Sequence, residues 1–327
     1  MSGSPGPPSR PPDDSGSEYL PGFDLPAANL TAERAILRVA TFPVRTQNKA
    51  RLIREYLYLF VMLTRHGNYI DGFAGPQEDD ALGMWAAKLA LELRPPLLRK
   101  FWFRKFFLFE KDPSSFKLLQ ELKESEPSIP KRVIEVHQGD FNVLVHPLLA
   151  SGKIKPKEAT FCLLDQRTFE CQWSTVEALA KHRKTGHKIE LFYFLAASWF
   201  DRAVSALGDC AATLRPWWGR NDWATFLDLA TLDRRNAIVS RFRSELEYRY
   251  VLAWPIYNRE KAGGRVMYYM VHASDHPQAP EFMSRAYEAA VRPLPPEQPS
   301  LYGDDPPSQG HTRARRGRAP RRQSGAA

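Results

Sequence analysis

A short apolar run that ends in a carboxylate and a glycine turn constrains the fold of this chain most. It covers residues 68–76, Asn-Tyr-Ile-Asp-Gly-Phe-Ala-Gly-Pro, in which Asp71 is followed by Gly72 and Gly75. Buried parallel strands lead into ligand-facing turns in this way, because ligands of open α/β sheets lie at the carboxyl ends of the strands. The glycines allow close backbone approach, and a carboxylate suits a hydroxyl or a cation but not a phosphate. The run predicts a nucleoside-facing turn, with a plain β-turn as the alternative.

The same arrangement recurs along the chain. Apolar strands are predicted at 106–110, 133–137 and 160–164, and they are followed by Glu110, Asp140 and Asp165. A fifth strand is predicted at 189–195, and helical patterns at about 47–65, 84–93, 114–124 and 174–182 flank or separate the strands. Strands that alternate with helices predict a doubly wound, mostly parallel α/β sheet of the Rossmann type.

The rhythm changes after the fifth strand. Residues of about 197–249 predict a helical insertion that is rich in tryptophan, including Trp217 and Trp218. These tryptophans form either the core of the insertion or a lid that offers aromatic faces to a base and closes over the loop after Asp165. Strands at 250–256 and 265–272, joined by a turn at Gly263 and Gly264, predict an antiparallel C-terminal hairpin, and a last helix is predicted at 279–291.

Composition sets the boundaries of the folded part. Residues 1–26 and 294–327 are rich in Pro, Gly, Ser or Arg and are predicted to be disordered, which leaves one α/β domain at 27–293. The net charge is +9, but six arginines lie between Arg313 and Arg322, so the basic charge belongs mainly to this tail. The chain has three cysteines and no apolar run near the roughly 18 residues of a membrane span, so we expect a cytoplasmic protein with no membrane association.

The residues at the strand ends predict a cofactor site. Glu110 follows the second strand and is placed to accept hydrogen bonds from both hydroxyls of a ribose. Asp140 is placed to accept from an adenine amino group, with Phe141 against the ring. At each position the alternative is an acid that only caps a helix. His272 and His276 are four apart, but Pro277 argues against a shared helical face, so we assign no metal site.

These motifs together resemble the class I S-adenosylmethionine-dependent methyltransferases, and among them the three-Cys-motif partner (TcmP) family. The resemblance covers about residues 45–290. It rests on the segments 69–76, 109–113, 139–141, 164–165, 217–220 and 268–277. It implies S-adenosylmethionine as cofactor, held by Asp71, Gly72, Phe73, Gly75, Glu110, Asp140 and Phe141. It also implies a protein partner, the three-Cys-motif protein encoded nearby.

The loop after the fourth strand departs from the pattern of amino-methylating relatives. Those enzymes carry Asp-Pro-Pro-Tyr there, in which rigid prolines direct a carbonyl at the target amine. This chain has Asp165-Gln166-Arg167, to which we assign the catalytic role. Asp165 is expected to polarise the acceptor, Gln166 to contact a base edge, and Arg167 either to meet an anionic substrate or to pair with Glu170 and fix the loop. Two hypotheses follow: a methyltransferase acting on nucleic acid or a nucleotide, and a methyltransferase-like subunit that binds its partner without turnover.

Overall fold

The computed structural model describes residues 48–76, 85–93, 102–258 and 265–291. All of them belong to one compact unit, within residues 1–292. Both terminal segments that the sequence predicts to be disordered, the Arg-rich tail and the Gly263-Gly264 turn lie outside the described residues.

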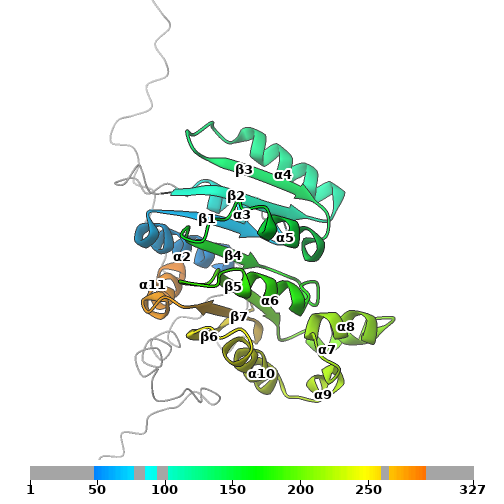
Figure 1. The fold of residues 1–327 in the computed structure, drawn as a ribbon. Coiled ribbons are helices and arrows are strands. Elements are labelled where there is room, and N and C mark those ends of the chain that lie inside the picture. Colours follow the sequence, from blue (N-terminus) through cyan, green and yellow to red (C-terminus); the bar gives the residue numbers. More distant parts are fainter. Residues whose placement is uncertain (1–47, 77–84, 94–101, 259–264, 292–327) are drawn as a thin grey trace, which may run out of the picture. The chain divides into compact units, whose positions relative to one another are not determined.

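A seven-stranded sheet organises the described residues, with strands β1 to β7 in the order β3-β2-β1-β4-β5-β7-β6 (Figure 1). The parallel strands are β1 (His66–Asp71), β2 (Trp102–Glu110), β3 (Val133–Gln138), β4 (Thr160–Leu164) and β5 (Glu190–Ala196). The hairpin strands are β6 (Tyr250–Tyr257) and β7 (Val266–Ser274). The strand β7 runs antiparallel to both β5 and β6. The predicted parallel sheet and its antiparallel end are therefore confirmed.

Helices cover both faces of the sheet (Figure 1). One face packs against α2 (Lys49–Thr64), α3 (Ala86–Leu91), α4 (Pro113–Ser125) and α11 (Ala279–Val291). The other packs against α5 (Phe141–Ala150), α6 (Trp173–Lys181) and the helical insertion. Neighbouring strand residues alternate between the two cores: Tyr69 contributes to the first and Ile70 to the second. Burial on both faces explains why β4 and β5 are almost entirely apolar, whereas the edge strand β3 is only partly buried and carries polar residues.

Helix α5 is not predicted by the sequence. It begins after Asp140, whose side chain caps it by accepting from the backbone N–H of Asn142. Pro147 lies inside the helix and argues against helix there, because it removes one backbone donor. Burial of Phe141, Val145 and Leu148 outweighs that loss.

The insertion has the predicted helical character. It consists of α7 (Phe200–Ser205), α8 (Cys210–Trp218), α9 (Trp223–Leu227) and α10 (Thr231–Ser244). Trp217 and Trp218 are buried and pack against Phe226 of α9, with ring centroids 5.4 and 4.4 Å apart. These two tryptophans therefore form core, and the lid interpretation is wrong for them.

Arg241 of α10 stabilises the aromatic core of the insertion. Its guanidinium lies between the rings of Trp173 and Trp218, 3.7 and 4.3 Å from their centroids, and pairs with Glu245. Gly219 ends α8 in the left-handed conformation, where a Cβ atom would lie 2.6 Å from the side chain of Trp173. Residues 217–219 thus pack the insertion against Trp173 of α6.

Candidate functional site

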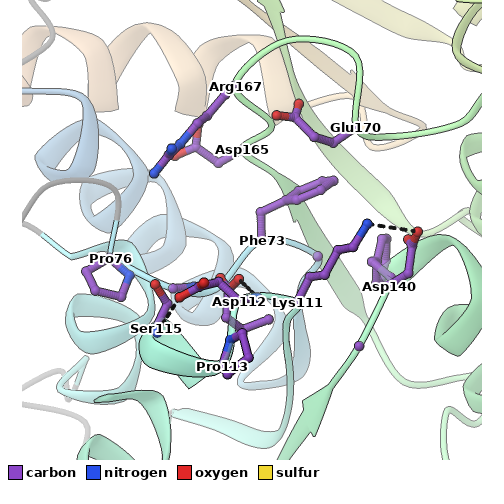
Figure 2. Close-up of a pocket in the computed structure, with 15 residues that line it drawn as sticks. Phe73, Pro76, Lys111, Asp112, Pro113, Ser115, Asp140, Asp165, Arg167 and Glu170 are labelled. Carbon is purple, nitrogen blue, oxygen red and sulfur yellow. Dashed lines mark hydrogen bonds and ion pairs between the residues drawn. The ribbon is translucent and has the colours of Figure 1, made fainter. Parts of the chain in front are cut away.

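The carboxyl ends of β1 to β4 surround one pocket of about 720 Å³ (Figure 2). Its lining comes from the turn after β1, the start of α4, the β3–α5 junction and the loop after β4. The lining residues are Gly72, Phe73, Gly75, Pro76, Glu110, Lys111, Asp112, Pro113, Ser115, Gly139, Asp140, Phe141, Asp165, Arg167 and Glu170. Eight of the ten residues that the sequence assigns to a site border this pocket, whereas Asp71 and Gln166 do not.

The turn after β1 is tied to both neighbouring strands. The backbone N–H of Gly72 donates to the carbonyl of Leu163, and that of Ala74 to the carbonyl of Phe109. A Cβ atom on Gly75 would lie 2.2 Å from Oε2 of Glu110, and one on Gly72 would lie 2.7 Å from the ring of Phe141. A larger residue at either position would displace the Glu110 carboxylate or the Phe141 ring, so the turn lies close against the residues that follow β2 and β3.

Glu110 bridges two backbone segments at the pocket wall. Its Oε2 accepts from the backbone N–H of Gly75 and its Oε1 from that of Asp112, both at 2.8 Å. Each carboxylate oxygen has two lone pairs, so Glu110 keeps acceptor capacity toward the pocket. Two fixed hydrogen bonds orient the carboxylate in advance of any ligand.

Asp140 and Phe141 form the wall after β3. Oδ1 of Asp140 accepts from the backbone N–H of Asn142 at 2.9 Å, and Oδ2 lies 3.9 Å from Nζ of the exposed Lys111. Asp140 therefore caps α5 and also borders the pocket, so its two sequence interpretations are compatible. Phe141 is buried, and its ring centroid lies 6.2 Å from that of Phe73.

Asp71 is buried and does not line the pocket. Its Oδ2 accepts from the hydroxyl of Tyr69 at 2.9 Å and its Oδ1 from the backbone N–H of Phe73 at 3.1 Å. Burial raises the pKa of this carboxyl to about 7, against the lowering effect of these two hydrogen bonds. Asp71 thus stabilises the turn after β1 through Tyr69 and Phe73. It is not among the residues that line the pocket, where the sequence predicts it.

Gln166 is also turned inward. Its side-chain amide donates to the carbonyl of Phe194 at 3.1 Å and accepts from the backbone N–H of Cys171 at 2.9 Å. The expectation that Gln166 contacts a base edge is therefore wrong: the residue is 1% exposed and fixes the loop after β4.

Arg167 and Glu170, from the same loop, border the pocket (Figure 2). Glu170 accepts from the backbone N–H of Thr168 at 2.7 Å.

Lys49 is a residue that the sequence did not mark as functional. It lies in the first turn of α2, and its Nζ approaches Oδ1 and Oδ2 of Asp165 at 2.9 and 2.8 Å. No local signal identifies the pair, because its members are 116 positions apart.

The charged residues among the described lining residues are mainly acidic. They include five carboxylates, on Glu110, Asp112, Asp140, Asp165 and Glu170, and two cations, on Lys111 and Arg167. Three negative charges are in excess, and the N-terminus of α4 is already capped by Asp112. Such a lining disfavours a phosphate and favours a ligand with cationic groups.

The strand order, with a parallel sheet closed by an antiparallel β7, is that of the class I methyltransferase-like Rossmann fold. No protein-family model and no curated protein matches the chain. Among solved structures the chain is similar to TYW2 from P. horikoshii in complex with MeSAdo, with a TM-score of 0.30 and 14% sequence identity. The match covers 72% of this chain and 64% of that one, which is less than two thirds of its length.

Within the described ranges no group of three His, Cys, Asp or Glu side chains could hold a metal ion. His272 instead lies in a buried polar cluster, with its Nε2 3.0 Å from both the Tyr56 hydroxyl and Oε1 of Glu190. The helices of the described segments include none that is long and apolar enough to span a membrane.

Proposed function

We propose that this protein binds S-adenosylmethionine in the acidic pocket and transfers its methyl group to a nucleic acid or a nucleotide. One observation carries the proposal: the glycine turn after β1, Glu110, the Asp140–Phe141 pair and Asp165 all border the same pocket. The order of these groups along β1 to β4 is the order in which a class I methyltransferase-like fold uses its strand ends.

The residues present fit this cofactor. In this proposal Glu110 accepts from the ribose hydroxyls, and Asp140 and Phe141 receive the adenine; in support, all three border the pocket and two backbone hydrogen bonds fix the Glu110 carboxylate. Gly72 and Gly75 allow the backbone to approach the amino-acid part. S-adenosylmethionine carries a sulfonium and an ammonium group but no phosphate, which agrees with the excess of carboxylates in the lining.

Bound S-adenosylmethionine supplies an already activated methyl group, so the protein's contribution is mainly to position the reactants. Asp165 and Arg167 border the pocket at the carboxyl end of β4, and Gln166 anchors the loop that carries them. In this proposal Asp165 polarises the acceptor, and Arg167 attracts an acceptor that bears negative charge, such as a phosphate-containing one.

A second candidate is a methyltransferase-like subunit that binds a three-Cys-motif protein without turnover, as the resemblance to the TcmP family implies. The observation that favours it is the ion pair between Lys49 and Asp165, which engages the carboxylate within the protein. The loop also lacks the rigid prolines that direct an acceptor amine, and Gln166 is committed to the core.

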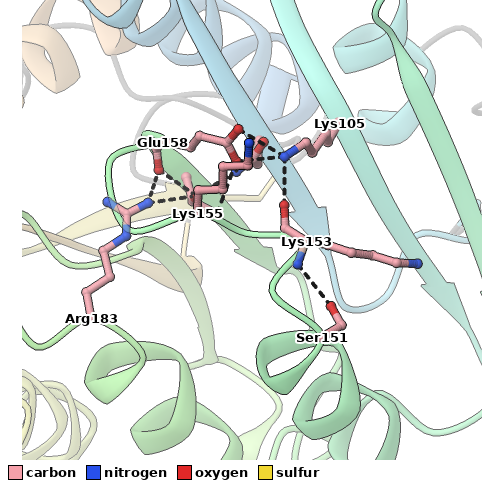
Figure 3. A network of polar contacts seen from close by, with 8 residues as sticks. Lys105, Ser151, Lys153, Lys155, Glu158 and Arg183 are labelled. Atoms are coloured by element: carbon pink, nitrogen blue, oxygen red, sulfur yellow. Dashed lines mark hydrogen bonds and ion pairs between the residues drawn. The ribbon is translucent and has the colours of Figure 1, made fainter.

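Calorimetry with S-adenosylmethionine tests the first step. We expect wild type to bind and Glu110→Ala to bind more weakly by about 1.5–3 kcal/mol, the value of a hydrogen bond to a charged group. Glu158→Ala is the control, because Glu158, like Glu110, accepts from a backbone N–H, and it accepts from Lys105 as well, but it lies before the amino end of β4 (Figure 3). Absence of binding by the wild type at millimolar ligand contradicts the proposal.

Transfer of a radiolabelled methyl group into total nucleic acid separates the two candidates. We expect transfer by wild type and none by Asp165→Ala. If both proteins bind the cofactor and transfer nothing, while a three-Cys-motif protein co-purifies with each, the binding-subunit function stands and catalysis does not.

A further inference from the structure

The cation that pairs with Asp165 reaches the pocket wall from a distant part of the chain. Lys49 precedes β1, whereas Asp165 follows β4. The Nζ atom of Lys49 approaches both oxygens of Asp165 at less than 3 Å, at 2.9 and 2.8 Å. The side chains are 13% and 8% exposed, so water screens the pair little.

Two aromatic rings hold the lysine at this position. Its Nζ lies 5.0 Å from the ring centroid of Phe194, at the end of β5, and 5.3 Å from that of Tyr268, on β7. Ring faces attract a cation, and more strongly when it is partly desolvated. Residues of β5, of β7 and of the loop after β4 therefore fix the ammonium group next to a carboxylate that lines the pocket.

The pair is poorly explained as a device for stability alone. A largely buried ion pair loses hydration on both sides, and apolar residues of the same volume are often at least as stabilising. The surroundings of Asp165 differ from those of Glu110 and Asp140: among the described contacts, neither of those pocket acids has a lysine Nζ within 3 Å, and the Nζ of Lys111 lies 3.9 Å from Oδ2 of Asp140. Pairing therefore reduces negative charge at the β4 end of the pocket specifically.

We propose that Lys49 is a positioning residue that acts through Asp165 and sets the charge that this end of the pocket presents to its ligand. The inference rests on the proposed function, since the ligand considered is S-adenosylmethionine. With Lys49 in place, the sulfonium cation meets a neutralised carboxylate, and cofactor and demethylated product are distinguished only weakly by charge. Loss of the Lys49 charge makes this end of the pocket more negative, which favours the cationic cofactor over the uncharged thioether of S-adenosylhomocysteine.

The two halves of the pair should thus shift ligand preference in opposite directions. The quantity to measure is the ratio of the Kd for S-adenosylhomocysteine to the Kd for S-adenosylmethionine, determined by calorimetry. We expect Lys49→Met to raise this ratio about fivefold and Asp165→Asn to lower it about fivefold, the effect of one unit charge at a dielectric between protein and water. The double variant should return to within about twofold of wild type, because both charges are then removed.

Two controls separate charge from structure. Lys49→Arg keeps the cation and should keep the ratio. Lys105→Met removes a lysine whose Nζ lies 2.8 Å from Oε2 of Glu158 (Figure 3). This pair does not line the pocket, so the variant should leave the ratio unchanged. If Lys49 had a purely structural role, its loss would weaken the binding of both ligands equally and leave the ratio of their Kd values constant.

The outcomes are distinguishable. Opposite shifts of the ratio support the inference; equal ratios in wild type, Lys49→Met and Asp165→Asn overturn it while the proposed cofactor stands. If Lys49→Met does not fold, the isosteric Asp165→Asn decides alone, and an unchanged ratio in that variant overturns the inference. If wild type binds neither ligand, the proposed function fails first and the inference with it.

Discussion

Asp71 offers a quantitative test of how the turn after β1 is built. Its carboxyl is 1% exposed and accepts from Tyr69 and from the backbone N–H of Phe73. Burial raises its pKa from 3.8 to about 7, and the charges of Asp165 and Glu110 add to the rise. The substitution Asp71→Asn keeps the shape and the acceptor for Phe73 but removes the ionisation.

The magnitude follows from the linkage between protonation and folding. Between pH 3.8 and about 7 the unfolded chain releases this proton while the folded protein retains it, so the contribution of Asp71 lowers stability as pH rises through that window. At about 1.4 kcal/mol per pKa unit, the full cost is about 4 kcal/mol, of which about 3 kcal/mol develops between about pH 5 and pH 8. Asn cannot ionise and carries no such cost.

Urea denaturation of both proteins across this pH range measures the effect. The stability of Asp71→Asn relative to wild type should increase by about 3 kcal/mol from about pH 5 to pH 8. The comparison between proteins cancels all other titrations. A difference that stays constant with pH would refute the argument that a buried, ionisable carboxyl supports the turn. Because Asp71 does not line the pocket, the Kd for S-adenosylmethionine should change less than about twofold, well under 1 kcal/mol.

Two further changes probe the pocket and the insertion separately. Gly75→Ala places a Cβ atom 2.2 Å from Oε2 of Glu110, so cofactor affinity should fall more than about tenfold (about 1.4 kcal/mol). Gly208→Ala is the control, because the Cβ position there is open and the affinity should not change. Equal affinities of the two variants in calorimetry would contradict the crowding argument. Arg241→Ala removes a buried cation that lies over the rings of Trp173 and Trp218, and it should lower the unfolding free energy by about 3 kcal/mol without changing cofactor affinity. A loss of affinity at unchanged stability would instead place the insertion at the pocket.

Much of the fold could be predicted because its signals are local. The apolar runs of β1 to β5, the turn residues after them and the helical periodicity of α2 and α6 are each readable within about ten neighbouring residues. Right-handed crossovers then bring the carboxyl ends of parallel strands to one edge. The meeting of Gly75, Glu110, Asp140 and Asp165 in one pocket therefore follows from their positions after successive strands.

Prediction was less successful where two local signals conflict. The cap at Asp140 favours a helix and Pro147 opposes it, and only the apolar contacts of α5 with the sheet decide in favour of the helix. For Trp217 and Trp218, composition allowed both a core and a lid. Their packing against Phe226 in the buried insertion selects the core.

The amino-acid sequence by itself determined the order of the strands along the chain and which acids end them. Only the tertiary structure decided which of these side chains face the pocket: Asp71 and Gln166 turn inward to hydrogen-bond partners, and Asp165 receives its counter-ion from Lys49, 116 positions earlier. The physical reason is that backbone conformation depends mainly on neighbouring residues, whereas the direction and charge state of a side chain depend on whatever packs against it in space.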